Sequence, residues 1–242
     1  MLMSTRIAMI GGHGKIALIA TRLLTEQGMQ VRSIVRSAQQ FDTVREYGGE
    51  PVLADIESAE TDFDALLEGA DVVIWSAGAG GGDPARTRAV DLEAAKRMID
   101  AAIKNSVRDF LMVSYRGAGP SHGLDPEHPM WQYAEAKSQA DAALRSSSLD
   151  WVIVAPAALT LETGRGTISA DITVPDGHGD DAAVDLPADG TPVAREDVAA
   201  LIAQLIEPMV QGRLHHVTVS ASGGDTAVAD VAAAAVQAVR DS

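Results

Sequence analysis

A glycine-rich stretch near the start of the chain has the residue types and spacing to hold a phosphate group. Two registers fit a dinucleotide-binding pattern, Gly11-x-x-Gly14-x-x-Ala17 and Gly12-x-Gly14-x-x-Ala17. In either register one glycine makes a tight turn, another lets a pyrophosphate approach the backbone, and the alanine lets a helix pack closely on a sheet. That helix would offer unpaired N–H groups and a positive dipole end to the phosphates. Because the stretch follows directly on apolar residues 7–10, it predicts dinucleotide binding.

The end of the second predicted strand indicates which dinucleotide is bound. Sites selective for NAD usually carry Asp or Glu there, about 20 residues past the glycines, to bond the ribose 2′-hydroxyl. This chain instead has Arg36, which stands 22 positions after Gly14 and is followed by Ser37. A guanidinium beside a hydroxyl suits a 2′-phosphate. We therefore predict NADP(H) as the cofactor in preference to NAD(H).

Alternating apolar and amphipathic stretches predict the elements that position this turn. Near-continuous apolar runs, typical of parallel strands buried on both faces, lie at 7–10, 31–35, 52–54, 72–75, 107–113 and 151–154. Helical stretches lie at 15–26, about 38–46, about 63–67, 84–104 and 129–146. Strand–helix–strand repetition implies right-handed crossovers, so the predicted fold class is α/β, a Rossmann-type doubly wound parallel sheet.

The strand–helix rhythm changes after residue 154. Residues 155–193 are rich in Gly, Pro and Asp, and they precede a helix at about 194–208, a strand at 214–219 and a helix at about 226–239. We predict one NAD(P)-binding domain over residues 1–242. In it, 1–154 form the cofactor-binding sheet, and 155–242 form mostly a small substrate cap with closing elements.

Composition excludes several classes of function. A net charge of −15 and a pI near 4.6 argue against binding to nucleic acid or anionic lipid. The chain has no cysteine, which excludes disulfides, thiolate metal sites and cysteine nucleophiles. The acidic stretch 176–181 lacks the spacing of a calcium loop, so no metal site is predicted. With no apolar run approaching 18 residues and no export signal at the start, we expect a cytoplasmic protein.

Further motifs follow the glycine turn and Arg36 along the chain. They are Ala54-Asp55, Asp71-Val72-Val73 leading to Ser76-Ala77-Gly78, Ala101-Ala102, Val113-Ser114, Tyr133-x-x-x-Lys137, Pro156 and Arg195-Glu196-Asp197-Val198-Ala199. With these the chain resembles the atypical short-chain dehydrogenases/reductases of the NAD(P)H-binding, NmrA-like type, over essentially its whole length. The resemblance implies a cofactor site made of Gly11, Gly12, His13, Gly14, Lys15, Ile16, Arg36, Asp55, Ala77, Gly78, Lys137 and Pro156.

The same resemblance implies the catalytic residues. Catalytic members of this superfamily use a Ser at the end of the fifth strand and a Tyr-x-x-x-Lys pair, which correspond to Ser114, Tyr133 and Lys137. Four residues on a helix put the last two on one face. An ammonium near the phenol is expected to lower its pKa from about 10, while Ser114 would hold the substrate carbonyl oxygen.

Two positions depart from the family pattern. The catalytic Asn of the superfamily, carried by the helix after the fourth strand, is replaced by Asp91. The Arg-Pro-Gly often found after the sixth strand reads Ala155-Pro156-Ala157 here. Both departures bear on turnover rather than on cofactor binding.

The sequence therefore predicts an NADP(H)-binding oxidoreductase that transfers a hydride to a small carbonyl, quinone or similar acceptor. Two alternatives stay open: a non-catalytic NAD(P)H-binding redox sensor, and a nucleotide-sugar epimerase or dehydratase. The expected partner is a small-molecule substrate, with neither nucleic acid nor membrane, and a homodimer is left open.

Overall fold

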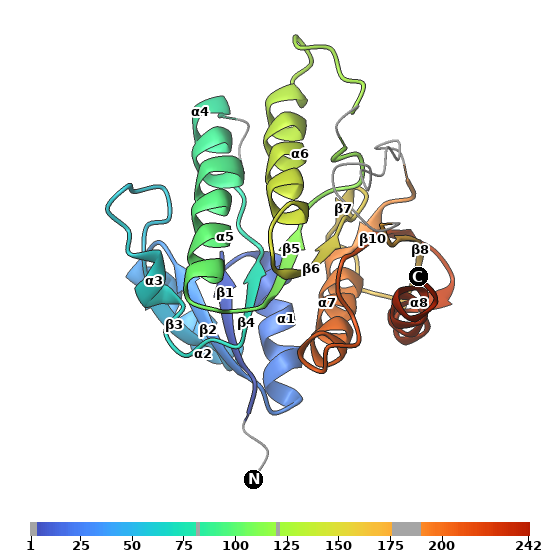
Figure 1. Ribbon diagram of the computed structural model, residues 1–242, viewed down its shortest axis with the longest axis horizontal. Helices are drawn as coiled ribbons and strands as arrows, with labels where there is room; N and C mark the ends of the chain where they lie inside the picture. The colour runs from blue at the N-terminus through green and yellow to red at the C-terminus, as the bar shows by residue number, and fades with distance from the viewer. Residues whose placement is uncertain (1–3, 81–82, 120–121, 176–189) are drawn as a thin grey trace.

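A nine-stranded sheet forms the centre of the computed structural model, which describes residues 4–80, 83–119, 122–175 and 190–242. The strand order is β11-β8-β10-β6-β5-β4-β1-β2-β3 (Figure 1). All pairs from β3 across to β10 are parallel, while β8 pairs antiparallel with both β10 and β11. The strands are β1 (Arg6–Ile10), β2 (Gln30–Val35), β3 (Glu50–Leu53), β4 (Val72–Trp75), β5 (Asp109–Val113), β6 (Asp150–Val154), β8 (Thr167–Thr173), β10 (Val217–Gly223) and β11 (Thr226–Ala227). The predicted Rossmann-type α/β fold is confirmed.

Helices cover both faces of this sheet (Figure 1). One layer contains α1 (Lys15–Glu26), α7 (Arg195–Val210) and α8 (Val228–Asp241), which pack against one another in that order. The other contains α3 (Phe63–Leu66), the continuous helix α4–η2–α5 (Pro84–Thr87, Arg88–Ala94 and Ala95–Lys104) and α6 (Trp131–Arg145). The remaining short elements are η1 (Ala38–Gln40), α2 (Phe41–Glu46) and a parallel pair, β7 (Leu159–Thr160) with β9 (Val193–Ala194).

The two-faced burial of β1 shows why the strands are almost continuously apolar. Ile7 and Met9 pack into the hydrophobic cluster on the α1 and α7 side. Ala8 and Ile10 pack into the cluster on the α5 and α6 side. Successive side chains of a strand point to opposite faces, so a sheet covered on both sides needs apolar residues at every position.

The chain reverses its direction of travel across the sheet at β1, which lies between β2 and β4. In open α/β sheets such a switch point leaves a crevice at the carboxyl ends of the strands, where ligands bind. The glycine turn follows β1 at this edge. Across the crevice, residues 88–94 of the long helix form a π-helical turn, a feature often found at functional sites.

The last third of the chain extends the same sheet. The strand predicted at 214–219 is shifted, because His216 takes a left-handed backbone (φ 50°) and regular pairing begins only at Val217. The predicted final helix likewise begins later, at Val228, after the short strand β11. Residues 176–189 of the acidic loop, which include the whole of the rejected calcium-like stretch 176–181, lie outside the described residues. Among the helices that the structure describes, none is long and apolar enough to cross a membrane.

Candidate functional site: a cofactor groove beside a buried polar cluster

A groove of about 250 Å³ lies at the switch point, beside the carboxyl ends of β1, β2, β3 and β4. Its walls come from the turn after β1, the segments after β2 and β3, the loop after β4 and the start of the long helix. Predicted cofactor residues that line it are Gly11, His13, Gly14, Arg36, Asp55, Ala77 and Gly78. The glycine turn, the strand ends and Arg36 therefore meet in one place.

The other predicted cofactor residues lie outside the groove lining. Gly12 faces β2, where an added Cβ would come within 2.5 Å of the Ser33 Cβ, and Ile16 is buried in the core. Lys15 is exposed at the first position of α1. The Pro156 carbonyl accepts a hydrogen bond from the Arg116 N–H at 2.8 Å, which joins the ends of β5 and β6. These residues support the turn and the sheet edge rather than forming the groove surface.

Backbone geometry explains the glycines of the turn. Gly11 has φ +79°, and a Cβ there would lie 2.6 Å from the Ala77 Cα, so this position requires glycine. The Gly14 N–H donates to the Gly11 carbonyl at 2.8 Å, which closes the turn. Gly14 is also the N-cap of α1 and has no side chain to bond the first free amides of the helix. Those amides remain available to an anion.

Several groove residues were not predicted from the sequence. They are Ile34, Val35, Gln40, Ala54, Ile56, Glu57, Ser76, Ala79, Arg86 and Val90. Half of them (Ile34, Val35, Ala54, Ile56 and Ser76) lie in the last two positions of a predicted strand or within two positions after it, so the rule that parallel strands present their carboxyl ends together would have found these five. Arg86 is different. It enters from α4, 29 positions after its ion-pair partner Glu57, and no local spacing signals that contact.

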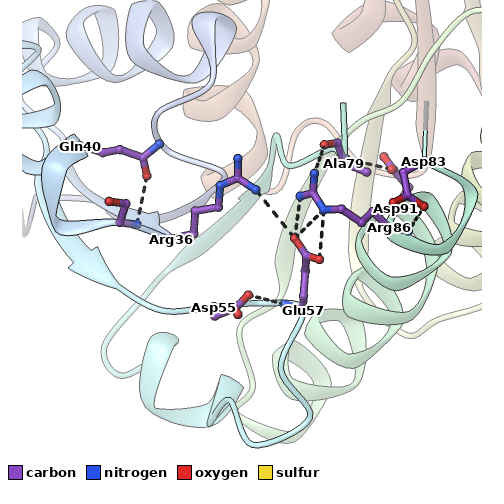
Figure 2. Close-up of polar contacts among 9 residues, drawn as sticks. Arg36, Gln40, Asp55, Glu57, Ala79, Asp83, Arg86 and Asp91 are labelled. Carbon is purple, nitrogen blue, oxygen red and sulfur yellow. Dashed lines mark hydrogen bonds and ion pairs between the residues drawn. The ribbon is translucent and has the colours of Figure 1, made fainter. Parts of the chain in front are cut away.

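Three charged side chains meet on one side of the groove (Figure 2). The Glu57 carboxylate lies between two guanidinium groups: its Oε1 is 2.6 Å from Arg86 Nη2 and 3.9 Å from Arg36 Nη1. The hydrogen bond from Arg86, reinforced by both positive charges, lowers the pKa of Glu57 against the opposing effect of its burial. Glu57 is therefore ionised near neutral pH, and two cations and one anion share this corner.

The predicted catalytic residues cluster farther along the sheet, at the carboxyl end of β5. The Lys137 side chain is 2% exposed, and its Nζ donates to the Val113 carbonyl at 2.8 Å. The same Nζ lies 4.0 Å from Oδ1 of Asp91 on the π-helical turn. Burial raises the pKa of Asp91, an effect that Lys137 and the Ala79 N–H partly offset. The ammonium is thus held by a backbone carbonyl and a buried carboxylate.

Ser114 has a partner that the sequence did not indicate. Its hydroxyl donates to Oδ2 of Asp141 at 2.5 Å, and Asp141 lies one helical turn after Lys137 on α6. Burial raises the pKa of Asp141 to about 6, although Arg145, Lys137 and the Ser114 hydroxyl oppose the rise. The Ser114 proton is therefore already used within the protein, where the sequence predicted that it would face a substrate oxygen.

The pKa of the Tyr133 phenol is raised, whereas the sequence predicted that it would be lowered. Burial is the largest cause of a raised pKa at Tyr133, and the negative charge of Asp91 adds to it. The expected lowering is therefore wrong: the burial of the phenol raises its pKa, and Lys137 Nζ lies against the Val113 carbonyl and Asp91. The ring also packs against Tyr115, with a centroid distance of 5.1 Å. The phenol therefore stays protonated at neutral pH.

Asp91 connects the buried cluster to the groove. Its Oδ2 accepts a hydrogen bond from the Ala79 N–H at 3.1 Å, and Ala79 lines the groove (Figure 2). Its other oxygen, Oδ1, is buried, faces Lys137 and has no hydrogen-bond partner. One carboxylate thus touches both the groove loop and the ammonium beside Tyr133.

The family to which the chain belongs follows from a comparison with models of known protein families. A protein-family model described as NAD(P)H-binding matches residues 11–208, a span that contains the groove and the buried cluster. The chain belongs to the NAD(P)H-binding family. Within it, this NAD(P)H-binding protein has the fold and relatives of an atypical short-chain dehydrogenase/reductase.

Individual relatives of this NAD(P)H-binding protein agree with that placement. The uncharacterised sugar epimerase YhfK of Bacillus subtilis is 30% identical over 93% of this chain and 97% of its own length. A solved structure from Bacillus halodurans, a proposed NAD-dependent epimerase/dehydratase, has a TM-score of 0.80 at 29% identity, covering 96% of this chain and all of that one. A Veillonella parvula short-chain dehydrogenase/reductase in complex with NADP shares the fold at 17% identity, with a TM-score of 0.67 and coverage of 93% and 97%.

Proposed function

We propose that this protein is an NADP(H)-dependent oxidoreductase that transfers a hydride to a small carbonyl, quinone or similar acceptor. The observation that carries the proposal is Arg36, which lines the groove at the end of β2, where NAD-selective sites place a carboxylate. Its side chain is 64% exposed, and its nearest approach to Glu57 is 3.9 Å, which is beyond hydrogen-bond distance. Its donors are therefore available to a 2′-phosphate.

The groove fits a dinucleotide on independent grounds. A Cβ at Gly11 would collide with Ala77, so the backbone itself forms the surface there. The α1 amino terminus opens onto the same surface without a side-chain cap, as a pyrophosphate requires. Asp55 follows β3 and Ala77 follows β4; both line the groove at the same carboxyl edge of the sheet and would bound the adenosine half. The bound cofactor would supply the hydride.

The buried cluster can supply a proton to a reduced substrate. Tyr133 is a protonated phenol at neutral pH, so it can donate that proton to a developing alkoxide. Lys137, held between Val113 and Asp91, would orient the phenol and the nicotinamide ribose. Ser114 can still accept a hydrogen bond while it donates its own to Asp141. Donation to a substrate carbonyl would require Ser114 to leave Asp141.

The test is a turnover assay with both reduced cofactors. Purified protein is mixed with NADPH or NADH and a panel of aldehydes, ketones, quinones and flavins, and loss of the nicotinamide absorbance is followed. The proposal expects steady oxidation of NADPH with at least one acceptor, and slower oxidation of NADH. Tight binding of NADPH without consumption across the panel would contradict the enzymatic part of the proposal.

One observation favours a non-catalytic sensor as the second candidate. The hydroxyl of Ser114 and the ammonium of Lys137 already donate hydrogen bonds to protein groups, Asp141 and the Val113 carbonyl. Neither group needs a substrate as its hydrogen-bond partner. In a sensor, cofactor binding would change the Ala79 loop, which Asp91 ties to this centre. Tight binding without turnover, together with a cofactor-dependent change in proteolysis of that loop, would support this function.

The names of two relatives favour an epimerase or dehydratase as a further candidate. Such an enzyme returns the hydride to its substrate, so the cofactor is not consumed. Incubation with nucleotide sugars and oxidised cofactor, followed by chromatography of the sugars, distinguishes it from both other candidates. A new sugar isomer without net reduction of the cofactor would favour this activity over the oxidoreductase.

A further inference from the structure

We propose that Glu57 and Arg86 together set how strongly the groove prefers a 2′-phosphorylated cofactor. Glu57 competes with the 2′-phosphate for Arg36, and Arg86 draws the Glu57 carboxylate away from Arg36. This inference rests on the proposed binding of NADP(H) in the groove. It makes Arg86 a specificity-determining residue that acts through Glu57.

The distances show which arginine holds Glu57. Arg86 Nη2 lies 2.6 Å from Glu57 Oε1, and Arg86 Nε is 3.2 Å from each carboxylate oxygen. Arg36 Nη1 is 3.9 Å from Oε1, beyond hydrogen-bond distance. The carboxylate is therefore bonded to Arg86 and only attracted to Arg36. Figure 2 shows Glu57 between the two side chains, with the Arg86 guanidinium bonded to both carboxylate oxygens of Glu57.

Both members of the Arg86–Glu57 pair are fixed by their own surroundings. Arg86 lies in the first turn of α4, whose N-cap Asp83 accepts hydrogen bonds from the Ala85 and Arg86 amides. Arg86 Nη1 also donates a hydrogen bond to the Ala79 carbonyl at 3.0 Å. The backbone N–H of Glu57 donates to Oδ1 of Asp55 at 3.0 Å. The pair is therefore anchored from two sides of the groove and is not a loose surface contact.

Exposure separates the roles of the two arginines. Arg86 and Glu57 side chains are 33% and 29% exposed, whereas Arg36 is 64% exposed. The partly buried pair is screened less by salt than an open surface pair. Arg36 keeps most of its donors free for a ligand. A second anion arriving at Arg36 would be repelled by Glu57, and that repulsion is smallest while Arg86 neutralises the carboxylate.

This arrangement predicts opposite effects for two neutral substitutions. In Glu57→Gln the competing charge is gone, so NADP⁺ affinity should rise by about 3- to 10-fold, with NAD⁺ affinity changed less than about 2-fold. In Arg86→Gln the carboxylate is released to pair with Arg36, so NADP⁺ affinity should fall by about 3- to 10-fold, again with little change for NAD⁺. A purely structural role for Arg86 would weaken both cofactors together.

The experiment is a double-mutant cycle measured by calorimetry, with NADP⁺ and NAD⁺ as the two titrants. Variants are Glu57→Gln, Arg86→Gln and the double variant, and circular dichroism checks the fold of each. Arg88→Gln is the matched control, because Arg88 lies on the same long helix but pairs with Glu93 and does not line the groove. The double variant should recover the NADP⁺ affinity of Glu57→Gln, since Arg86 has no carboxylate left to hold.

Failure of the specificity role and failure of the proposed function give different results. If both single variants shift NADP⁺ and NAD⁺ equally, or if the double variant stays as weak as Arg86→Gln, the specificity role is overturned while NADP(H) binding stands. If the wild-type protein binds neither nucleotide, the proposed function fails and the specificity role fails with it. The opposed single effects with recovery in the double variant support the proposal.

Discussion

The cofactor groove and the buried cluster are built in opposite ways. The groove is formed by backbone, strand ends and exposed charges: the α1 amides carry no side-chain cap, and the Arg36 side chain is 64% exposed. In the cluster, Ser114 and Lys137 are nine-tenths or more buried and already bonded to Asp141 and to the Val113 carbonyl. Binding a ligand thus requires no rearrangement in the groove, whereas chemistry on a substrate requires the cluster to exchange at least one internal hydrogen bond.

Substitutions in the glycine turn should give the largest contrast between binding and folding. Gly14→Val is expected to abolish NADPH binding with a native circular dichroism spectrum, because the side chain would occupy the space in front of the α1 amino terminus. The nearest atom to the new Cβ is the Gly11 carbonyl oxygen, at 3.1 Å, and the next is the Ser76 carbonyl oxygen, at 3.7 Å. Gly12→Val is the matched comparison. Its Cβ would lie 2.5 Å from Ser33 on β2, so this variant should lose stability by several kcal/mol, an order-of-magnitude expectation for a buried clash. Fluorescence titration measures NADPH binding by each variant, and thermal melts measure the stability of each. Retained binding in Gly14→Val would place the phosphates elsewhere.

The second-largest effect concerns turnover. Tyr133→Phe should leave NADPH affinity nearly unchanged and lower turnover by about 10²- to 10⁴-fold, the usual range for a lost general acid. Lys137→Met should impair both binding and turnover, because the ammonium is buried beside Asp91 and Val113. Steady-state kinetics on any acceptor that is reduced, together with direct titration of NADPH, separates these effects. An unchanged turnover number in Tyr133→Phe would move the proton donor to another group.

A smaller effect is expected at the entrance of the groove. Arg36→Asp removes a charge-assisted hydrogen bond and adds repulsion, which should cost about 1–3 kcal/mol of NADPH binding free energy. The lower part of that range applies because the side chain is largely exposed and its charge is screened. NADH binding should change little. Parallel titrations with both cofactors measure the difference, and an equal loss for NADH would show a general defect of the groove.

The smallest effect is a pH dependence of stability inside the cluster. The pKa of Asp141 is raised from 3.8 to about 6, so the folded chain binds this proton more tightly than the unfolded chain does. The resulting stabilisation is present below pH 3.8 and is lost as pH rises through about 6. Asp141→Asn lacks this ionisation and can still accept the Ser114 hydrogen bond, so its stability relative to wild type should rise over that interval. Chemical denaturation at several pH values tests it, and a difference that does not vary with pH would contradict the raised pKa.

The sequence predicted the groove better than the cluster for a physical reason. The Gly11–Ala17 turn and Arg36 act through local geometry: a strand must end, the backbone must turn and a helix must begin within a few residues. The side chain of Ser114 instead depends on Asp141, 27 positions away on α6. The pKa of Tyr133 depends on burial, and no spacing of residues reports how much water a fold excludes.

The other differences between prediction and structure have a similar origin, because they also depend on three-dimensional contacts and backbone geometry that the sequence pattern does not report. The sequence predicted a strand at 214–219, but Leu214 is buried ahead of β10 and the left-handed His216 delays the pairing until Val217. Arg86 was missed because α4 meets the loop after β3 only in three dimensions. Periodicity identifies elements, and the contacts between distant elements decide which charges share a site.

The most direct test of NADP(H) binding at this groove is a competitive titration of the wild-type protein with NADPH and NADH. Binding is followed by tryptophan fluorescence in one buffer at fixed salt, because the interaction with the 2′-phosphate depends on ionic strength. The account predicts saturable binding of both cofactors, with NADPH bound more tightly by about 10-fold, the order of one charge-assisted interaction. Equal affinities, or tighter binding of NADH, would contradict the assignment of Arg36 as the residue that selects the cofactor.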